Sequence, residues 1–227
     1  MSDQKSLSDI RILVVDDEPF IREVLVRILK QIGIQHIVEA EDGSDALTKL
    51  SSAKPDLIIL DIMMEPMNGL KFLKTLRIGL CDAPFDMRVM VLTGADDEAI
   101  LGAAMALDCD AFVKKNIGPE AIQTRIEQVL NETAAQKEVS SYHAVTIPEV
   151  ILDMPAPEKI EVEAPSPIAR EITVLDADIG LVVDRDLLSD IGCVLLSENT
   201  VLTKSHIDRL YDLSEILKLH TMWVRDA

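Results

Sequence analysis

The sequence predicts an α/β fold, with a five-stranded parallel sheet that is doubly wound by helices on both of its faces. Two observations support this prediction. The first 130 residues alternate short apolar runs with amphipathic stretches, and such alternation is typical of βα units in series. The apolar runs are rich in Val, Ile and Leu without a polar face, as expected for strands that helices cover on both sides.

Each element follows from a local pattern. An apolar strand expected at residues 11–15 ends in two aspartates, and Pro19 then suits the first turn of a helix. Apolar residues at helical spacing continue to Ile32, and Gly33 suits the end of that helix. The same reasoning predicts strands at 36–40, 57–60, 88–92 and 111–113, and helices near 44–52, 69–78 and 96–107 and from Pro119.

The pattern changes after residue 131. The last helix is expected to run on through 131–139, and five prolines then punctuate an acidic stretch that we interpret as a tether. Short strands are expected near 181–183, 193–196 and 222–224, with a helix capped by Thr203. We therefore expect a first domain over 9–131, a helix extension with a Pro-rich linker over 132–170, and a small α+β module over 171–227.

Charge and composition limit the classes of binding partner that we expect for this protein. The net charge is −18, and residues 132–227 carry 8 basic against 18 acidic side chains, so nucleic acid and anionic membranes are not expected partners. The three cysteines form no CxxC pair and are interpreted as reduced thiols. The sequence shows no signal peptide or membrane-spanning run, and a cytoplasmic location is expected.

Polar residues gather at the ends of the predicted strands, where open α/β sheets bind their ligands. Clustered carboxylates repel one another, and a hard cation such as Mg²⁺ relieves this repulsion. A lysine opposite can pair with a carboxylate first and with a phosphoryl oxygen later, so the set suits phosphoryl transfer. The residues are Asp16 and Asp17 after the first strand, Asp61 after the third, Thr93 after the fourth, and Lys114 and Lys115 after the fifth.

Five short motifs occur in order at these strand ends: VVDDEP (14–19), LDIMM (60–64), NGL (68–70), VLTGA (91–95) and FVKK (112–115). With them, residues 9–131 resemble the receiver domain of two-component response regulators. The resemblance implies a flavodoxin-like fold and a phosphoprotein that accepts its phosphoryl group from a histidine kinase or His-phosphotransfer protein. Such a chain phosphorylates itself and is not a turnover enzyme.

The resemblance also implies the site roles. Asp61 would be the phosphoacceptor; Asp16, Asp17, Asp61 and the Met63 carbonyl would hold Mg²⁺, and Thr93 would bind a phosphoryl oxygen. Phe112 would transmit the change, and its position three residues earlier makes Lys115 the matching lysine.

The chain departs from the family pattern at several positions. Asn116 and Glu65 stand where the family usually has proline, and residues 79–87 form an insertion. Met63 and Ala95 would flank the line of water attack, and neither side chain can activate water, so we expect slow hydrolysis of a phosphoaspartate.

A phosphorylated receiver has two alternatives. A phosphohydrolase with an aspartyl nucleophile usually shows a DxD motif, which Asp61-Ile62-Met63 lacks. A degenerate receiver would serve as a phosphorylation-independent scaffold.

The output function is predicted from the C-terminal module. That module resembles a small segment found beside HD-GYP-type domains, but it has no adjacent His-Asp pair. We therefore expect signalling through protein interaction or homodimerisation, with an output partner that the sequence does not name.

Overall fold

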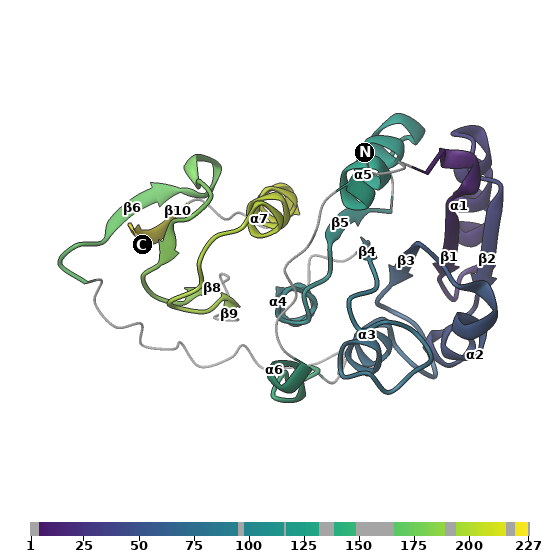
Figure 1. The fold of residues 1–227 in the computed structure, drawn as a ribbon, viewed down its shortest axis with the longest axis horizontal. Helices are drawn as coiled ribbons and strands as arrows, with labels where there is room; N and C mark the ends of the chain where they lie inside the picture. The colour runs from purple at the N-terminus through teal and green to yellow at the C-terminus, as the bar shows by residue number, and fades with distance from the viewer. Residues whose placement is uncertain are drawn as a thin grey trace. The chain divides into compact units, whose positions relative to one another are not determined.

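A computed structural model describes residues 5–94, 98–115, 117–131, 139–148, 166–188, 194–216 and 221–226. The chain divides into two compact units. The first comprises Met1–Gly94 and Cys109–Ala144, and the second comprises Ala95–Asp108 and Val145–Ala227. The second unit therefore combines a short internal segment with the C-terminal part of the chain (Figure 1).

The first unit contains the predicted parallel sheet. Its strands run in the order β2-β1-β3-β4-β5, with every neighbouring pair parallel (Figure 1). The strand order reverses between β1 and β3, and ligands bind at such a switch point in open α/β sheets. The strands are β1 Arg11–Val15, β2 His36–Ala40, β3 Leu57–Asp61, β4 Val89–Thr93 and β5 Ala111–Lys114.

Helices cover both faces of this sheet, as predicted (Figure 1). Helices α1 (Pro19–Gln31) and α5 (Pro119–Asn131) contact one another and bury Leu29 and Ile126 in one core with alternate strand residues such as Ile59. Helices α2 (Gly43–Ala53) and α3 (Gly69–Arg77) contact each other on the opposite side. The strands are buried on both faces, which explains their continuous apolar sequence.

Two strands end one residue later than predicted, because each includes the polar residue that follows its apolar run. The strand expected at 57–60 extends to Asp61, and the strand expected at 88–92 runs over Val89–Thr93. Both strands therefore end on a buried polar residue. This shift matters for the site because it fixes the backbone of Asp61 and Thr93 in the sheet.

The expected insertion, residues 79–87, is irregular in the structure and is held by a buried arginine. Arg77 is fully buried, and its Nη1 donates to the carbonyls of Phe85 and Met87 at 2.7 and 2.8 Å. Its Nη2 lies 3.6 Å from Asp110 Oδ2, which also accepts a hydrogen bond from the Val89 amide. These contacts fix the approach to β4.

The region after α5 contains a helix where part of the tether was expected. Helix α5 is described as far as Asn131, and a short helix, α6 (Val139–His143), contacts α3 and buries Tyr142 completely. Lys74 Nζ donates to the His143 carbonyl at 3.1 Å. The remainder of the predicted extension and most of the predicted tether, 132–138 and 149–165, lie outside the described residues.

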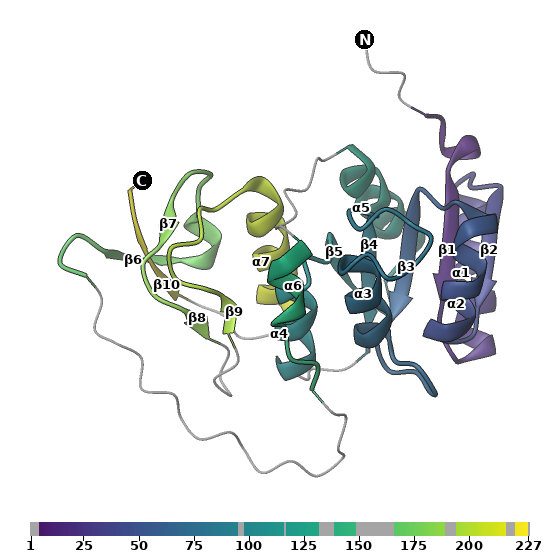
Figure 2. The ribbon, with the colours of Figure 1, turned by 60° about the horizontal axis from the view of Figure 1, so that its bottom comes forward.

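The second unit joins α4 (Glu98–Ala106) with the C-terminal elements. The predicted strands near 181–183, 193–196 and 222–224 are found, with Cys193 outside the described residues, and β6 and β8 were not predicted. Thr203 caps the predicted helix, since its Oγ1 accepts from the His206 amide at 3.2 Å. An antiparallel sheet has the order β6-β10-β7, and β8 pairs with β9. These elements are β6 Arg170–Thr173, β7 Val182–Val183, β8 Leu187–Leu188, β9 Val194–Leu196, α7 Lys204–Ile216 and β10 Thr221–Arg225 (Figure 2).

Two short 3-10 helices complete the described elements, at Leu7–Asp9 and Val174–Asp176. None of the described helices combines the length and the apolar character needed to cross a lipid bilayer.

Candidate functional site

The candidate site lies at the carboxyl ends of the parallel strands. Asp16 follows β1 directly, Asp61 is the last residue of β3, and Lys115 follows β5. Parallel strands end on the same edge of a sheet, so residues separated by up to 99 positions in the sequence meet there. The three side chains therefore lie together at this edge of the sheet, as the sequence predicts.

Three carboxylates form a tight cluster at this edge. Carboxylate oxygens of Asp16, Asp17 and Asp61 all lie within 4.8 Å of one another. Asp16 and Asp61 are buried, while Asp17 is exposed. Backbone amides stabilise the two buried carboxylates: Glu18 N donates to Asp16 Oδ1 at 2.9 Å, and Ile62 N donates to Asp61 Oδ1 at 2.8 Å.

Lys115 supplies the positive charge opposite the cluster. Its ammonium lies 2.9 Å from Asp16 Oδ2 and 2.9 Å from Asp61 Oδ2. These carboxylates raise the pKa of Lys115 above its usual value, although burial alone would lower it. The side chain of the neighbouring Lys114 is exposed. Of the two lysines that the sequence offered, Lys115 is therefore the one that contacts Asp61.

Burial dominates the acid–base behaviour of Asp61. It raises the pKa of this carboxyl from 3.8 to about 6, against the opposing effect of the Lys115 ammonium. The negative charge of Asp16 adds to the increase. A positive charge placed beside Asp61 would lower this pKa and favour the ionised carboxylate.

A glycine permits the close approach of α3 to Asp61. The Gly69 amide donates to the Ile62 carbonyl at 3.0 Å, and a Cβ at position 69 would collide with the Asp61 carbonyl. Asn68 precedes it as the N-cap, with its side chain accepting from the Lys71 amide at 2.9 Å. The sequence NGL therefore combines a helix cap with a position that has no room for a side chain.

The other predicted site residues lie around this cluster. Thr93 is buried at the end of β4, Phe112 is buried in β5, and Met63 is 40% exposed two residues after Asp61. Their expected roles in binding phosphoryl oxygen, transmitting the change and supplying a metal-binding carbonyl stay predictions. Ala95 and Asn116 lie outside the described residues.

The carboxylate cluster fits a hard divalent cation. Asp16 Oδ2 is buried and, among the described residues, lies 2.9 Å from the Lys115 ammonium without a hydrogen bond of good geometry. Two buried carboxylates and an exposed one offer several oxygens on one side, where solvent can complete the coordination. Mg²⁺ prefers this combination of carboxylate oxygens and water. Asp16, Asp17 and Asp61 would hold the ion.

Some residues of the site were not foreseen from the sequence. Arg22 Nη1 donates to the Asp16 carbonyl at 2.7 Å, and Glu18 Oε1 lies 3.9 Å from the Lys115 ammonium. The sequence gives only a weak indication that Arg22 belongs to the site. Arg22 lies one turn into the helix that begins after Asp16 and Asp17, where its side chain can reach back to the strand end.

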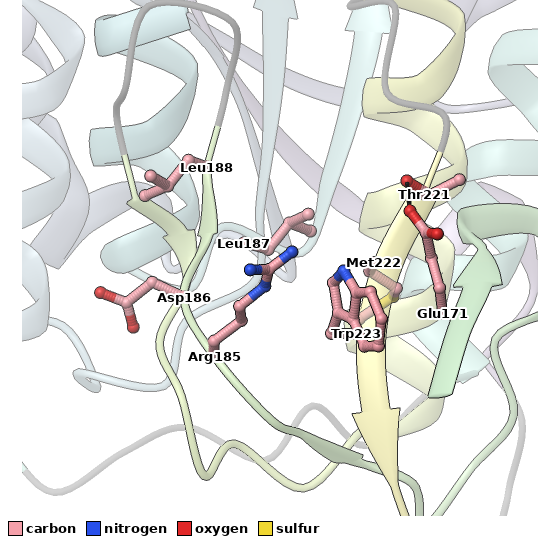
Figure 3. A pocket seen from close by; sticks show the side chains of 8 residues that line it. All are labelled: Glu171, Arg185, Asp186, Leu187, Leu188, Thr221, Met222 and Trp223. Atoms are coloured by element: carbon pink, nitrogen blue, oxygen red, sulfur yellow. Dashed lines mark hydrogen bonds between the residues drawn. The ribbon is translucent and has the colours of Figure 1, made fainter. Parts of the chain in front are cut away.

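A second hollow lies within the second unit and is lined by residues of β6, β8 and β10 and by Arg185 and Asp186 (Figure 3). Its volume is about 210 Å³. The Arg185 guanidinium lies 5.0 Å from the centroid of the Trp223 ring, and Thr221 Oγ1 donates to Glu171 Oε1 at 2.7 Å. The side chain of Asp186 accepts a hydrogen bond from the Glu198 amide at 2.7 Å. The polar side chains of this hollow thus have partners, and the hollow lacks the clustered carboxylates of the first site.

Comparisons with known proteins agree with the motifs. Residues 12–127 match the family model described as the response regulator receiver domain. The chain is 30% identical over 198 residues to Response regulator MprA of Mycolicibacterium vanbaalenii, covering 87% of this chain and 77% of that protein. It is 34% identical over 136 residues to a probable transcriptional regulator, ycf27, of Guillardia theta, covering 60% of this chain and 50% of that one.

Solved structures include similar chains. The chemotaxis protein CheY4 of Vibrio cholerae is 26% identical, with a TM-score of 0.48 over 53% of this chain and 98% of that one. A putative response regulator from Chloroflexus aurantiacus is 23% identical, with a TM-score of 0.48 over 54% of this chain and 98% of that one.

Proposed function

Since the chain belongs to the response regulator receiver family, we propose that it is a two-component response regulator phosphorylated on Asp61. The donor is a phosphohistidine on a histidine kinase or His-phosphotransfer protein, and the reaction depends on Mg²⁺. The observation that supports this proposal best is the position of Asp61, buried in one cluster with Asp16 and Asp17 and 2.9 Å from the Lys115 ammonium.

The chain's residues serve the transfer by position and charge. An Asp61 carboxylate oxygen attacks the phosphorus, the new O–P bond forms as the N–P bond to the donor imidazole breaks, and the electron pair leaves with that nitrogen. The Lys115 ammonium, now shared between two carboxylates, turns to a phosphoryl oxygen, and Thr93 donates its hydroxyl to another. A bound Mg²⁺ would neutralise charge on the phosphoryl oxygens.

A small phosphodonor tests this function without knowledge of the natural kinase. The full chain is incubated with acetyl phosphate in Mg²⁺ buffer, and its intact mass is measured. We expect the mass of one phosphoryl group to be added to the wild type, and none to Asp61→Asn or in the presence of EDTA. No gain in the wild type would favour the phosphorylation-independent scaffold.

The rest of the chain carries the output in this proposal. The receiver covers 9–131, the helix extension and linker cover 132–170, and the module at 171–227 binds another protein or a second copy, all in the cytoplasm. The name of the ycf27 relative is that of a transcriptional regulator, but residues 132–227 carry 8 basic and 18 acidic side chains. This surplus of negative charge disfavours contact with DNA phosphates.

The output is tested by comparing partners of the activated and the resting chain. A pull-down with and without beryllofluoride is expected to recover a protein in an activation-dependent manner. Salt-sensitive retention on random-sequence DNA at physiological ionic strength would instead indicate a nucleic-acid partner and contradict the proposed output.

A further inference from the structure

Asp17 is the exposed member of the carboxylate cluster. The carboxylates of Asp16 and Asp61 are held by backbone amides and by the Lys115 ammonium. Within the described parts of the chain, by contrast, no hydrogen bond or ion pair holds the Asp17 carboxylate. Exposed side chains without such contacts change rotamer rapidly. The direction of this carboxylate therefore depends on the backbone that carries it.

The peptide between Asp16 and Asp17 sets that direction. The preceding peptide still belongs to the sheet, because the Asp16 amide donates to the Ala40 carbonyl at 3.2 Å. The next peptide leaves the sheet, and its carbonyl, that of Asp16, accepts a hydrogen bond from Arg22 Nη1 at 2.7 Å. Rotation of this peptide would turn Asp17 away from Asp16. The bond from Arg22 thus acts on the link between two of the three proposed metal ligands.

The Arg22 side chain is suited to hold this peptide. It comes from the first turns of α1 and folds back to the end of β1, and it is 16% exposed. A hydrogen bond from a charged donor is shorter and stronger than one between neutral groups, and its partly buried position limits competition from water. The contact is therefore strong enough to restrict the peptide that carries Asp17.

A second contact orients the Arg22 guanidinium. Its Nε lies 3.6 Å from Glu39 Oε2 on β2, the strand that pairs with β1. The Glu39 side chain is 49% exposed, and an exposed ion pair of this kind contributes little to stability. Its effect is directional: one edge of the guanidinium faces β2, and Nη1 is left to donate to the Asp16 carbonyl.

Charge and geometry predict opposite effects of Arg22 on a cation bound at the cluster. A guanidinium beside a cation site repels the cation, so a residue that acted by its charge alone would weaken metal binding. A residue that fixes a metal ligand strengthens binding, because that ligand need not be ordered when the cation arrives. The sign of the change after removal of Arg22 separates the two effects.

We propose that Arg22 is a positioning residue for the divalent cation: its hydrogen bond to the Asp16 carbonyl fixes the following peptide and directs the Asp17 carboxylate toward Asp16 and Asp61. Arg22 itself contacts neither the cation nor the phosphoryl group. The inference rests on the proposed function, because it takes this carboxylate cluster as the Mg²⁺ site.

Three variants of the full chain test this role. Arg22→Met removes the donor and the charge but keeps an apolar stem. Arg22→Lys keeps the charge, but its side chain is one atom shorter and lacks the planar guanidinium. Arg27→Met is the matched control, because Arg27 lies on the same helix and pairs with Glu23 at 2.9 Å on the exposed surface. Urea unfolding in EDTA establishes that each variant is folded.

Mn²⁺ is the probe, since the paramagnetic resonance signal of the free ion is lost on binding, and Mg²⁺ is added as the competitor. We expect Arg22→Met to weaken the binding of both ions by roughly 10–100-fold, the usual effect of losing a group that orients a metal ligand. Arg22→Lys should lose less affinity, and Arg27→Met should match the wild type. Unchanged or tighter binding by Arg22→Met, or by Arg22→Lys if the first variant does not fold, would overturn the inference.

Phosphorylation by acetyl phosphate gives a second readout that separates positioning from a general loss of structure. In Arg22→Met the Mg²⁺ concentration for half-maximal rate should rise by a larger factor than the rate at saturating Mg²⁺ falls. A lower saturated rate at the wild-type half-saturation concentration would overturn the positioning role. A wild type that binds Mn²⁺ through Asp17 but gains no phosphoryl group would overturn the proposed function alone, and a wild type that binds no Mn²⁺ would overturn both.

Discussion

Asp61 occupies a position that costs free energy when its carboxylate is ionised. The residue ends a strand that is buried along its whole length and is itself only 2% exposed, and an unpaired buried charge is strongly disfavoured. The Lys115 ammonium and the Ile62 amide compensate part of this cost. The part of this free-energy cost that is not compensated appears as the raised pKa of Asp61. A further cation beside the carboxylate would reduce it.

Replacing Lys115 tests its part in the transfer. Lys115→Met removes the ammonium that faces Asp61, and we expect the rate of phosphorylation by acetyl phosphate to fall by roughly 10²–10³-fold, the effect of losing one aligned electrostatic contact in a transition state. Lys114→Met is the matched control, since the adjacent side chain is exposed, and it should retain the wild-type rate. Equal effects of the two changes would contradict the assignment.

The pKa of Asp61 predicts how stability changes with pH in metal-free buffer. Between pH 3.8 and about 6 the folded protein keeps a proton on Asp61 that the unfolded chain loses. The folded state then binds more protons than the unfolded state, so this group lowers stability as pH rises through that range. Relative to Asp61→Asn, the wild type should lose up to about 3 kcal/mol of unfolding free energy between pH 4 and pH 7.

Urea unfolding of both proteins in EDTA measures this difference. Saturating Mg²⁺ should reduce the loss, because a cation favours the ionised carboxylate. A constant difference across the range, or a wild type that gains stability relative to the variant, would be incompatible with the raised pKa.

We expect the lifetime of the phosphoaspartate to depend on Met63. Its partly exposed side chain offers no group that could orient or activate a water near Asp61. We expect the phosphorylated chain in Mg²⁺ buffer to decay over minutes or longer, and Met63→Glu to shorten this half-life. Phosphate release from the purified phosphoprotein gives both values, and wild-type decay within seconds would count against the prediction.

Among the secondary-structure elements, the ends of the parallel strands determine the position of the candidate site. Short apolar runs predict β1 to β5, and clusters of apolar residues bounded by turn residues predict α1 to α5, within a few residues. Strand β8 has two residues and α6 has five. Neither is long enough to repeat its period. The prediction lacks β8 and assigns α6 to the tether, whereas β7, also of two residues, is predicted from the apolar run at 181–183.

The contact between α3 and β3 gives a test at this scale. Because a Cβ at position 69 would meet the Asp61 carbonyl and the Ile62 Cα, Gly69→Ala should destabilise the protein by about 1–3 kcal/mol. It should also slow phosphorylation, since the backbone of Asp61 must shift. Gly118→Ala is the control, because a Cβ there meets nothing within 4 Å. Comparable denaturation midpoints of the two variants would refute the steric argument.

In the whole molecule, the position of the candidate site can be predicted from the sequence, whereas several long-range ion pairs cannot. Asp16, Asp61 and Lys115 could be placed together because the topology of parallel strands brings strand ends to one edge. The pairs Arg77–Asp110 and Asp108–Arg209 follow no such rule, since each depends on tertiary packing of helices and loops. In the sequence, the arginines of these pairs look like ordinary charged surface residues, but both are fully buried in the fold.

The same distinction applies to the division of the chain. Sequence patterns end the first domain at residue 131, while α4 groups with the C-terminal module in the second unit. Helix α4 is apolar and largely buried, and strand β9 of the same unit, which contacts it, lies about 90 positions away. The second unit therefore includes a helix that lies between β4 and β5 in the sequence.

Whether Asp61 carries the phosphoryl group can be tested by locating that group in the sequence. The chain is phosphorylated in Mg²⁺ buffer and treated with borohydride, which reduces an acyl phosphate to an alcohol, and the peptides are then sequenced by mass spectrometry. We expect homoserine at position 61 and unmodified aspartate at positions 16 and 17. Reduction at another aspartate, or at none in a folded wild-type chain, would contradict it.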